Sequence, residues 1–79
     1  MFIKFLNARL NLSTVGSIVQ EPKKIRLNFP DWVMAPLDGQ EWEDGEGSDW
    51  CIYDRDEDYC ILEFTPKHPA YAKIIEFFS

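Results

Sequence analysis

Histidine, cysteine and long apolar runs are scarce in this chain, and each scarcity excludes a class of protein. The 79 residues include one histidine and two cysteines, too few for a disulfide framework or a cysteine-rich structural zinc site. No apolar run approaches the ~20 residues that span a bilayer. The apolar residues 1–6 are interrupted by Asn7 and Arg9 too early for a signal peptide. We therefore expect a cytoplasmic protein of one small domain, with no cofactor and no metal.

The motifs of common enzymes are also missing. The sequence has no glycine-rich phosphate loop, no Gly-x-Ser-x-Gly and no His-Glu-x-x-His. His68, the only histidine, lies beside Pro69 at the start of an expected helix, and no third residue is placed to orient a Cys–His pair. The acidic residues lie in polar sequence rather than in the apolar surroundings that a general acid requires. We expect no enzymatic activity.

What the sequence has in abundance is negative charge, and it is concentrated. Between Asp38 and Glu63 there are eleven acids and one base, Arg55, a net charge of −10, whereas the remaining residues carry +4. A block of one sign is either a solvated segment or an interaction surface. This block contains tryptophan and tyrosine, which are typical of interface hot spots. A cationic partner is therefore the functional interpretation, and a loop that only keeps the domain soluble is the alternative.

The candidate partner-binding residues lie in an acidic loop, residues 38–49, and in an acidic hairpin tip, residues 54–58. They are Asp38, Glu41, Trp42, Glu43, Asp44, Glu46, Asp49, Tyr53, Asp54, Asp56, Glu57 and Asp58. Among the tryptophans, we expect Trp42 to be exposed and Trp50 to be in the core, and we leave Trp32 open between the two.

The apolar pattern predicts mostly strands. In residues 2–12 most apolar side chains share one parity, with Lys4 the exception, which indicates a first strand that either ends near Leu6 or runs further. Residues 17–20 and 25–29 flank a Pro22 turn, and the second segment alternates as a half-buried strand does.

Residues 50–53 and 59–64 predict a hairpin. The favoured register places Tyr53 opposite Tyr59 and Asp54 opposite Asp58, a like-charge pair that costs stability. It also puts Cys51 on the opposite sheet face from Cys60, so that the two thiols stay reduced.

The C-terminal residues predict a helix. Tyr71, Ile74, Ile75 and Phe78 form one apolar stripe, and Pro69 suits the first helical position. The expected fold is α+β: a four- or five-stranded, mostly antiparallel sheet with one C-terminal helix packed on one face.

A calcium site at the hairpin tip is a further alternative. Asp54, Asp56 and Asp58 match the first three ligand positions of an EF-hand loop. Tyr59 stands where that loop needs glycine, and Thr65 where it needs the bidentate glutamate. A structural module with a weak calcium-binding tip thus stays an alternative function.

The first third of the chain resembles a small phage-encoded anti-CRISPR protein of the type I kind. The similarity is carried by Phe2-Ile3-Lys4-Phe5-Leu6, and by Ile18-Val19-Gln20-Glu21 leading into Lys24-Ile25-Arg26. Phe5 and Gln20 stand where the family pattern has tyrosines, so no contact residue is carried over. The resemblance implies a sheet-plus-helix fold and an inhibitor that binds a CRISPR effector complex and blocks its target DNA.

The charge pattern and the resemblance suggest one hypothesis. We expect a non-enzymatic inhibitor from a phage or mobile element that binds a basic nucleic-acid-binding protein of the host, most specifically a CRISPR effector complex. An immunity protein or antitoxin that caps a basic nuclease is the alternative of the same physical type. Neither nucleic acid itself nor a membrane is the expected partner, and the oligomeric state is left undetermined.

Crowded acids should make the free protein sensitive to salt. Raising NaCl from about 20 to about 500 mM should raise the melting temperature, because salt screens the repulsion among the carboxylates. Thermal unfolding at several salt concentrations measures this. A flat response would mean that the acids are dispersed in space and would contradict the electrostatic interpretation.

Overall fold

The computed structural model describes residues 1–37 and 49–79. The described elements are β1 (Phe2–Phe5), β2 (Ala8–Asn11), the 3₁₀ helix η1 (Leu12–Thr14), β3 (Ser17–Glu21), β4 (Lys24–Pro30), α1 (Asp31–Met34), the 3₁₀ helix η2 (Ala35–Leu37), β5 (Trp50–Arg55), β6 (Tyr59–Phe64) and α2 (Tyr71–Phe78). Strands β3, β4, β6 and β5 form, in that order, a four-stranded antiparallel sheet, and β1 pairs with β2 in a separate two-stranded sheet.

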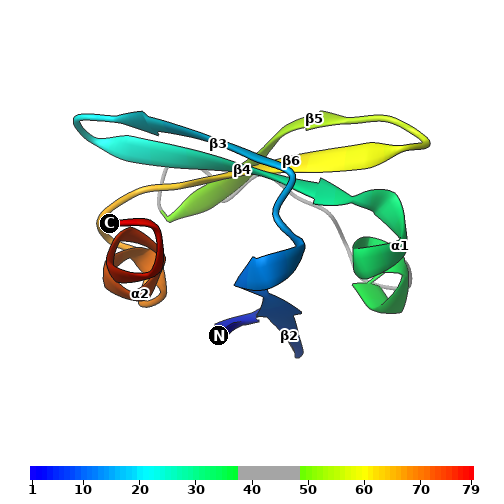
Figure 1. The fold of residues 1–79 in the computed structure, drawn as a ribbon, viewed down its shortest axis with the longest axis horizontal. Helices are drawn as coiled ribbons and strands as arrows, with labels where there is room; N and C mark the ends of the chain where they lie inside the picture. Colours follow the sequence, from blue (N-terminus) through cyan, green and yellow to red (C-terminus); the bar gives the residue numbers. More distant parts are fainter. Residues whose placement is uncertain (38–48) are drawn as a thin grey trace.

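The elements are arranged in two layers (Figure 1). The four-stranded sheet forms one layer. Helix α2, the β1–β2 hairpin and α1 lie side by side beneath it and cover one of its faces. The α+β fold with a C-terminal helix packed on one sheet face, predicted from the sequence, is confirmed. None of the described helices is long and apolar enough to cross a membrane.

The two central strands supply most of the buried sheet face. Strand β4 alternates buried and half-buried residues along its whole length, because successive side chains of a strand point to opposite faces. Its buried residues oppose buried residues of β6, in the pairs Ile25–Phe64, Leu27–Leu62 and Phe29–Cys60. The alternation predicted for residues 25–29 and the turn at Pro22 are confirmed, since Glu21 pairs with Lys24.

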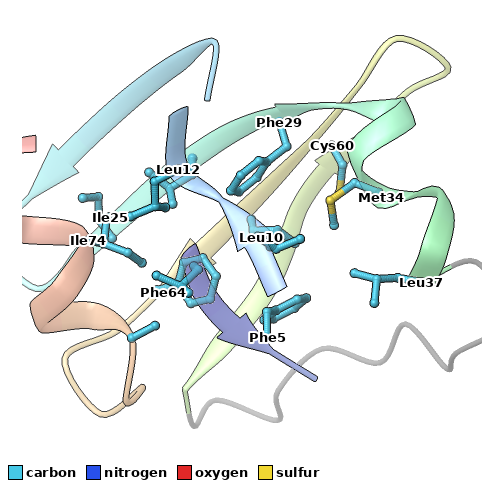
Figure 2. Close-up of a cluster of buried hydrophobic side chains, with 14 residues drawn as sticks. Phe5, Leu10, Leu12, Ile25, Phe29, Met34, Leu37, Cys60, Phe64 and Ile74 are labelled. Carbon is cyan, nitrogen blue, oxygen red and sulfur yellow. The ribbon is translucent and has the colours of Figure 1, made fainter. Parts of the chain in front are cut away.

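The lower layer fills the core from three directions (Figure 2). The β1–β2 hairpin contributes Phe5 and Leu10 beneath the centre of the sheet, α2 contributes Ile74, and the α1–η2 segment contributes Met34 and Leu37. All five side chains are at most 1% exposed. Each element thus buries its apolar side against the same sheet face, which makes one continuous core.

Of the two extents left open for the first strand, the shorter one is correct, because β1 ends at Phe5 and the chain does not run on as one strand to residue 12. The chain reverses at Leu6 and Asn7, and β1 pairs antiparallel with β2. Leu6 adopts a positive φ of 55°, a conformation that costs an L-residue roughly 1–2 kcal/mol. The reversal also changes the parity of burial, because Ile3 and Phe5 are buried before it and Leu10 and Leu12 after it.

The predicted register of the β5–β6 hairpin is also wrong. Trp50 pairs with Phe64 and Ile52 with Leu62, and a bulge at Tyr53 then shifts the pairing so that Asp54 opposes Ile61. The expected Asp54–Asp58 like-charge pair therefore does not form. The turn consists of residues 56–58 rather than 54–58, since β5 continues to Arg55.

The predicted placement of the cysteines on opposite faces is nevertheless correct, because Cys51 lies before the bulge, where the pairing is shifted by two residues and its side chain keeps its face. Cys60 is buried in the core, and Cys51 lies opposite Glu63 on the other face. The two cysteines form no disulfide. Trp50, expected in the core, is half-buried, and its ring packs edge-on against Phe5 with 4.8 Å between centroids.

Helix α2 begins at Tyr71, two residues after Pro69, so the prediction that Pro69 occupies the first helical position is wrong. The backbone just before the helix is instead held by hydrogen bonds to His68. Its Nδ1 accepts a hydrogen bond from the Ala70 N–H at 3.0 Å, and its carbonyl accepts one from the Tyr71 N–H at 3.0 Å. The imidazole packs against Phe64, with 4.8 Å between ring centroids. Burial lowers the pKa of His68, and the charge of Asp49 opposes this effect.

This placement of His68 should make stability depend on pH. The folded state disfavours the imidazolium more than the unfolded chain does, so the full contribution of the neutral ring is present above the unfolded pKa of about 6.5. It is lost as the pH falls through that value toward the lower folded pKa. Melting temperatures at about pH 7.5 and about pH 5.5 should therefore differ more for the parent than for His68→Asn. Asparagine keeps an oxygen that can accept the Ala70 hydrogen bond and does not titrate. Equal pH dependence in the two proteins would show that His68 contributes nothing.

Candidate partner-binding surface

Polar groups of the β5–β6 turn fix its shape. The Asp56 N–H donates to the Tyr59 carbonyl at 2.9 Å, and the Glu57 N–H donates to Oδ1 of Asp56 at 2.6 Å. The Tyr59 hydroxyl donates to Oδ2 of Asp54 at 2.9 Å. The side chains of all four acids, Asp54, Asp56, Glu57 and Asp58, are exposed. The turn and the end of β5 together therefore display four carboxylates from a backbone that is hydrogen-bonded internally.

The negative field of the turn acts on its own tyrosine. The hydrogen bond to Asp54 raises the pKa of Tyr59, and the charge of Asp54, desolvation and the charges of Asp56 and Asp58 raise it further. The phenol thus remains a hydrogen-bond donor to Asp54 at neutral pH, which keeps that carboxylate on the turn.

The start of α1 is joined to this turn. The Asp31 N–H donates to the Asp58 carbonyl at 3.2 Å, and Nη2 of Arg55 lies 3.5 Å from Oδ1 of Asp31. Figure 1 shows the same arrangement, with α1 beneath the end of the sheet where β5 turns into β6. A fifth carboxylate, Asp31, therefore joins the three acids of the turn and Asp54 of β5.

Trp32 follows Asp31 in α1 and is 69% exposed, the most exposed large hydrophobic side chain in the described part of the chain. Tryptophan side chains are usually largely buried, so an exposed indole next to a group of carboxylates is informative. Exposed tryptophan is enriched at the hot spots of protein interfaces. The sequence had left Trp32 open between core and interface. The structure places it on the surface.

We call this surface the acidic corner. It comprises Asp31, Trp32, Asp54, Asp56, Glu57 and Asp58. Its five carboxylates and the guanidinium of Arg55 give a net charge of −4. Four of the six residues were candidates from the sequence. Asp31 was missed and Trp32 was left open because both lie more than twenty positions before Asp54, the first acid of the hairpin tip.

Tyr53, another predicted binding residue, lies on the open face of the sheet rather than at the tip. The bulge turns its ring over Arg26, whose guanidinium carbon is 3.9 Å from the ring centroid. Nε of Arg26 also donates to Glu63 at 2.9 Å, and its Nη1 lies 3.5 Å from Glu21. Tyr53 remains 55% exposed. Its first role in the structure is to cover Arg26.

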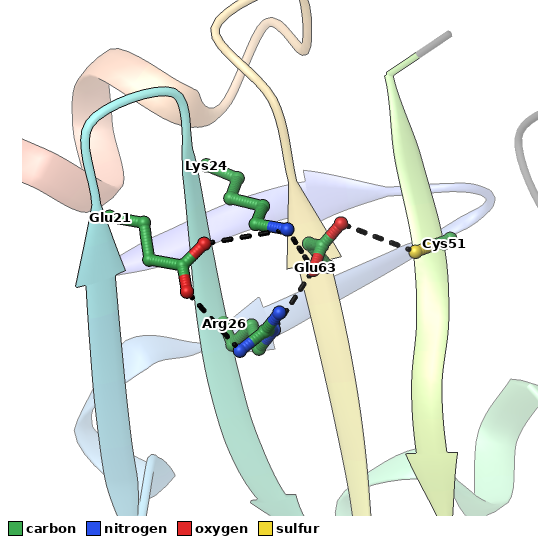
Figure 3. A network of polar contacts seen from close by, with 5 residues as sticks. All are labelled: Glu21, Lys24, Arg26, Cys51 and Glu63. Atoms are coloured by element: carbon green, nitrogen blue, oxygen red, sulfur yellow. Dashed lines mark hydrogen bonds and ion pairs between the residues drawn. The ribbon is translucent and has the colours of Figure 1, made fainter. Parts of the chain in front are cut away.

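A network of ion pairs neutralises this open face (Figure 3). Lys24 lies 3.4 Å from Glu21 and 3.8 Å from Glu63, and Arg26 contacts the same two acids. The Cys51 thiol adds a 3.7 Å contact to the other oxygen of Glu63. Two bases balance two acids here. Glu63, which belongs to the acidic block of the sequence, is therefore not part of the acidic surface.

The other predicted residues are not at the acidic corner. Asp49 precedes β5, at the opposite end of this strand from the tip, and its carbonyl accepts the Thr65 N–H at 2.9 Å. Six residues of strand separate the two ends by roughly 20 Å. The candidates of the acidic loop that lie outside the described residues are Asp38, Glu41, Trp42, Glu43, Asp44 and Glu46.

No cluster of three or more histidine, cysteine, aspartate or glutamate side chains in residues 1–37 and 49–79 is arranged to hold a metal ion. At the turn, Asp54 and Asp56 are each engaged by a hydrogen bond from the protein itself. This arrangement gives no support to the calcium-binding alternative.

No family model, curated protein sequence or solved structure matches this chain. The geometry of the acidic corner is therefore the main structural basis for a functional proposal.

Proposed function

We propose that this protein is a non-enzymatic inhibitor that binds a basic surface of a nucleic-acid-handling protein through the acidic corner. The specific target that we propose is a CRISPR effector complex. The observation that carries the proposal is the grouping of five carboxylates with one exposed tryptophan at a single end of the fold.

Electrostatics supports a cationic partner. Proteins that bind nucleic acid present Lys and Arg side chains to its phosphates, and carboxylates can pair with these same side chains. Complementary charge mainly accelerates association and excludes wrong partners. CRISPR effector complexes hold DNA in positively charged channels, and the resemblance of the first third of the chain to type I anti-CRISPR proteins leads to the same target.

The fixed shape of the turn supports binding rather than solvation alone. Binding is weakened by the entropy lost when mobile side chains and loops become ordered. Here the three hydrogen bonds within the turn and the contacts to Asp31 already order the backbone that carries the acids. A segment that served only for solubility would not need this order, nor an exposed indole beside it.

The charge itself can be tested without loss of bulk. In Asp54→Asn/Asp56→Asn/Glu57→Gln/Asp58→Asn, the association rate with a purified type I CRISPR effector complex should fall by about tenfold or more. Surface plasmon resonance at two salt concentrations measures this, and inhibition of target-DNA binding should weaken in parallel. The melting temperature should not fall, since none of these four side chains forms an ion pair within the described part of the chain.

Glu76→Gln is the matched control, because Glu76 is an exposed carboxylate on α2, away from the acidic corner. If the quadruple variant inhibits as well as the parent, the charge serves solubility and the proposal is wrong. If the parent does not bind the CRISPR complex but binds a basic nuclease with the same salt dependence, the protein is an immunity protein and the proposed CRISPR target is wrong.

Substitution of Trp32 tests whether the aromatic residue of the acidic corner contributes to binding. Trp32→Ala should weaken binding by ~2 kcal/mol, roughly 30-fold in Kd, if the indole is an anchor. Folding stability should be nearly unchanged, because the side chain is 69% exposed. Phe77→Ala removes another surface aromatic, 36% exposed on α2, and should leave binding intact. An equal effect of the two substitutions on Kd would show that Trp32 has no special role.

A further inference from the structure

The β1–β2 hairpin carries a second charged site, of opposite sign. Lys4 on β1 is directly paired with Arg9 on β2, and both side chains are exposed. Like charges in directly opposed positions destabilise a strand pair. The sequence had suggested such a repulsive pair among the acids of the β5–β6 hairpin. The structure shows it instead between two bases at the other hairpin.

A third base reaches the same place from α2. Lys4, Arg9 and Lys73 line one surface hollow of about 230 Å³ together with Phe2 and Ile3. A smaller hollow of about 70 Å³ adjoins it and shares Lys4 and Lys73. Among the described residues, no acidic side chain lines either hollow and none of the three bases forms an ion pair. We call the larger one the basic hollow.

The rim of the basic hollow is aromatic. Phe2 lies on the same side of β1 as Lys4, since residues two apart on a strand share a face, and its ring is 58% exposed. Three converging cations suit an oxyanion with several negative charges. An exposed aromatic ring beside phosphate-binding cations is the arrangement on which a nucleobase stacks.

From this geometry we propose that the basic hollow binds the phosphate groups of a nucleotide, with Lys4, Arg9 and Lys73 on the phosphates and Phe2 against the base. The volume suits a diphosphate group rather than a whole nucleotide, so the base lies outside the hollow, on the exposed ring. Bound phosphate also removes the repulsion between Lys4 and Arg9, so binding and folding are coupled.

The basic hollow is separate from the acidic corner. Its residues come from β1, β2 and α2 in the lower layer, whereas the acids come from the β5–β6 turn and α1 at one end of the sheet (Figure 1). Nucleotide binding is therefore a property additional to the proposed inhibition, and either can hold without the other.

Thermal unfolding with pyrophosphate, ADP and adenosine tests the site in the full chain. At about 5 mM and constant ionic strength, pyrophosphate and ADP should raise the melting temperature on the order of 5 °C, and adenosine should not. Lys4→Gln/Arg9→Gln/Lys73→Gln should abolish both increases. The same variant without ligand should melt at or above the parental temperature, because the opposed charges are gone.

Lys23→Gln/Lys67→Gln is the control, since both lysines are exposed and line neither hollow; it should respond as the parent does. In the parent, stacking of the base on Phe2 should make the affinity for ADP higher than that for pyrophosphate. Phe2→Ala should remove this difference, which calorimetry measures. No stabilisation of the parent, or equal stabilisation of the triple variant, would overturn the site. An ADP preference that survives Phe2→Ala would overturn the stacking of the base.

Discussion

One face of the four-stranded sheet carries a continuous set of fully buried side chains, from Ile25 and Phe29 on β4 to Leu62 and Phe64 on β6. Covering that face is the constraint on which the other described elements depend. A helix of eight residues is about 12 Å long and cannot cover a sheet of four strands alone. The β1–β2 hairpin and the α1–η2 segment supply the missing apolar area, and each is anchored by side chains that are at most 1% exposed. In a domain of this size, each such side chain contributes roughly 1.5–3 kcal/mol, a large share of a small net stability.

The same constraint decides where charge can go. Because one face of the sheet is buried, charged side chains of the strands lie on the open face, where they are either hydrated or paired with one another. Those around Arg26 are paired. Arg26 and Glu63 have side chains that are only 19% and 16% exposed, so their pairing is better shielded from solvent than an ordinary surface ion pair. Net charge is left to the places where the chain turns or where the lower layer meets water. Among residues 1–37 and 49–79, the acidic corner and the basic hollow are two such places.

Much of this architecture could be predicted from the sequence, for reasons that are local. Residues 25–29 and 59–64 alternate regularly, and residues 71–78 carry one apolar stripe, so two strands and a helix were predicted correctly. The first hairpin was missed because its turn, Leu6-Asn7, lacks the glycine that normally marks a tight reversal. Leucine accepts the positive φ there, and its side chain packs against the core. The exact β5–β6 register was missed because a strand pattern repeats every two residues, so a slip of two preserves every buried face.

The candidate site was predictable to the same extent. The acids of the hairpin turn are contiguous in sequence, so composition alone identified them, and the structure groups four of them. What composition could not supply was the place of Asp31 and Trp32, which come to the turn because Pro30 at the end of β4 pairs with Tyr59 and because Asp31 contacts Asp58 and Arg55. The basic hollow was hidden for the same reason. Lys4, Arg9 and Lys73 are isolated bases in the sequence, and the reversal at Leu6 and the docking of α2 bring them to one hollow.

Two features of the first hairpin oppose folding, and they occur together. Leu6 is in a left-handed conformation, and Lys4 faces Arg9 across the strands that this turn connects. A small domain has little stability to spare for either. The burial of Ile3, Phe5, Leu10 and Leu12 explains why the hairpin forms despite these costs, but it does not explain why two bases occupy the outward positions, where almost any polar residue would serve the core equally well. The proposed ligand, whose charge cancels the repulsion, would explain it, and it would bind at the hairpin that carries both of these costs.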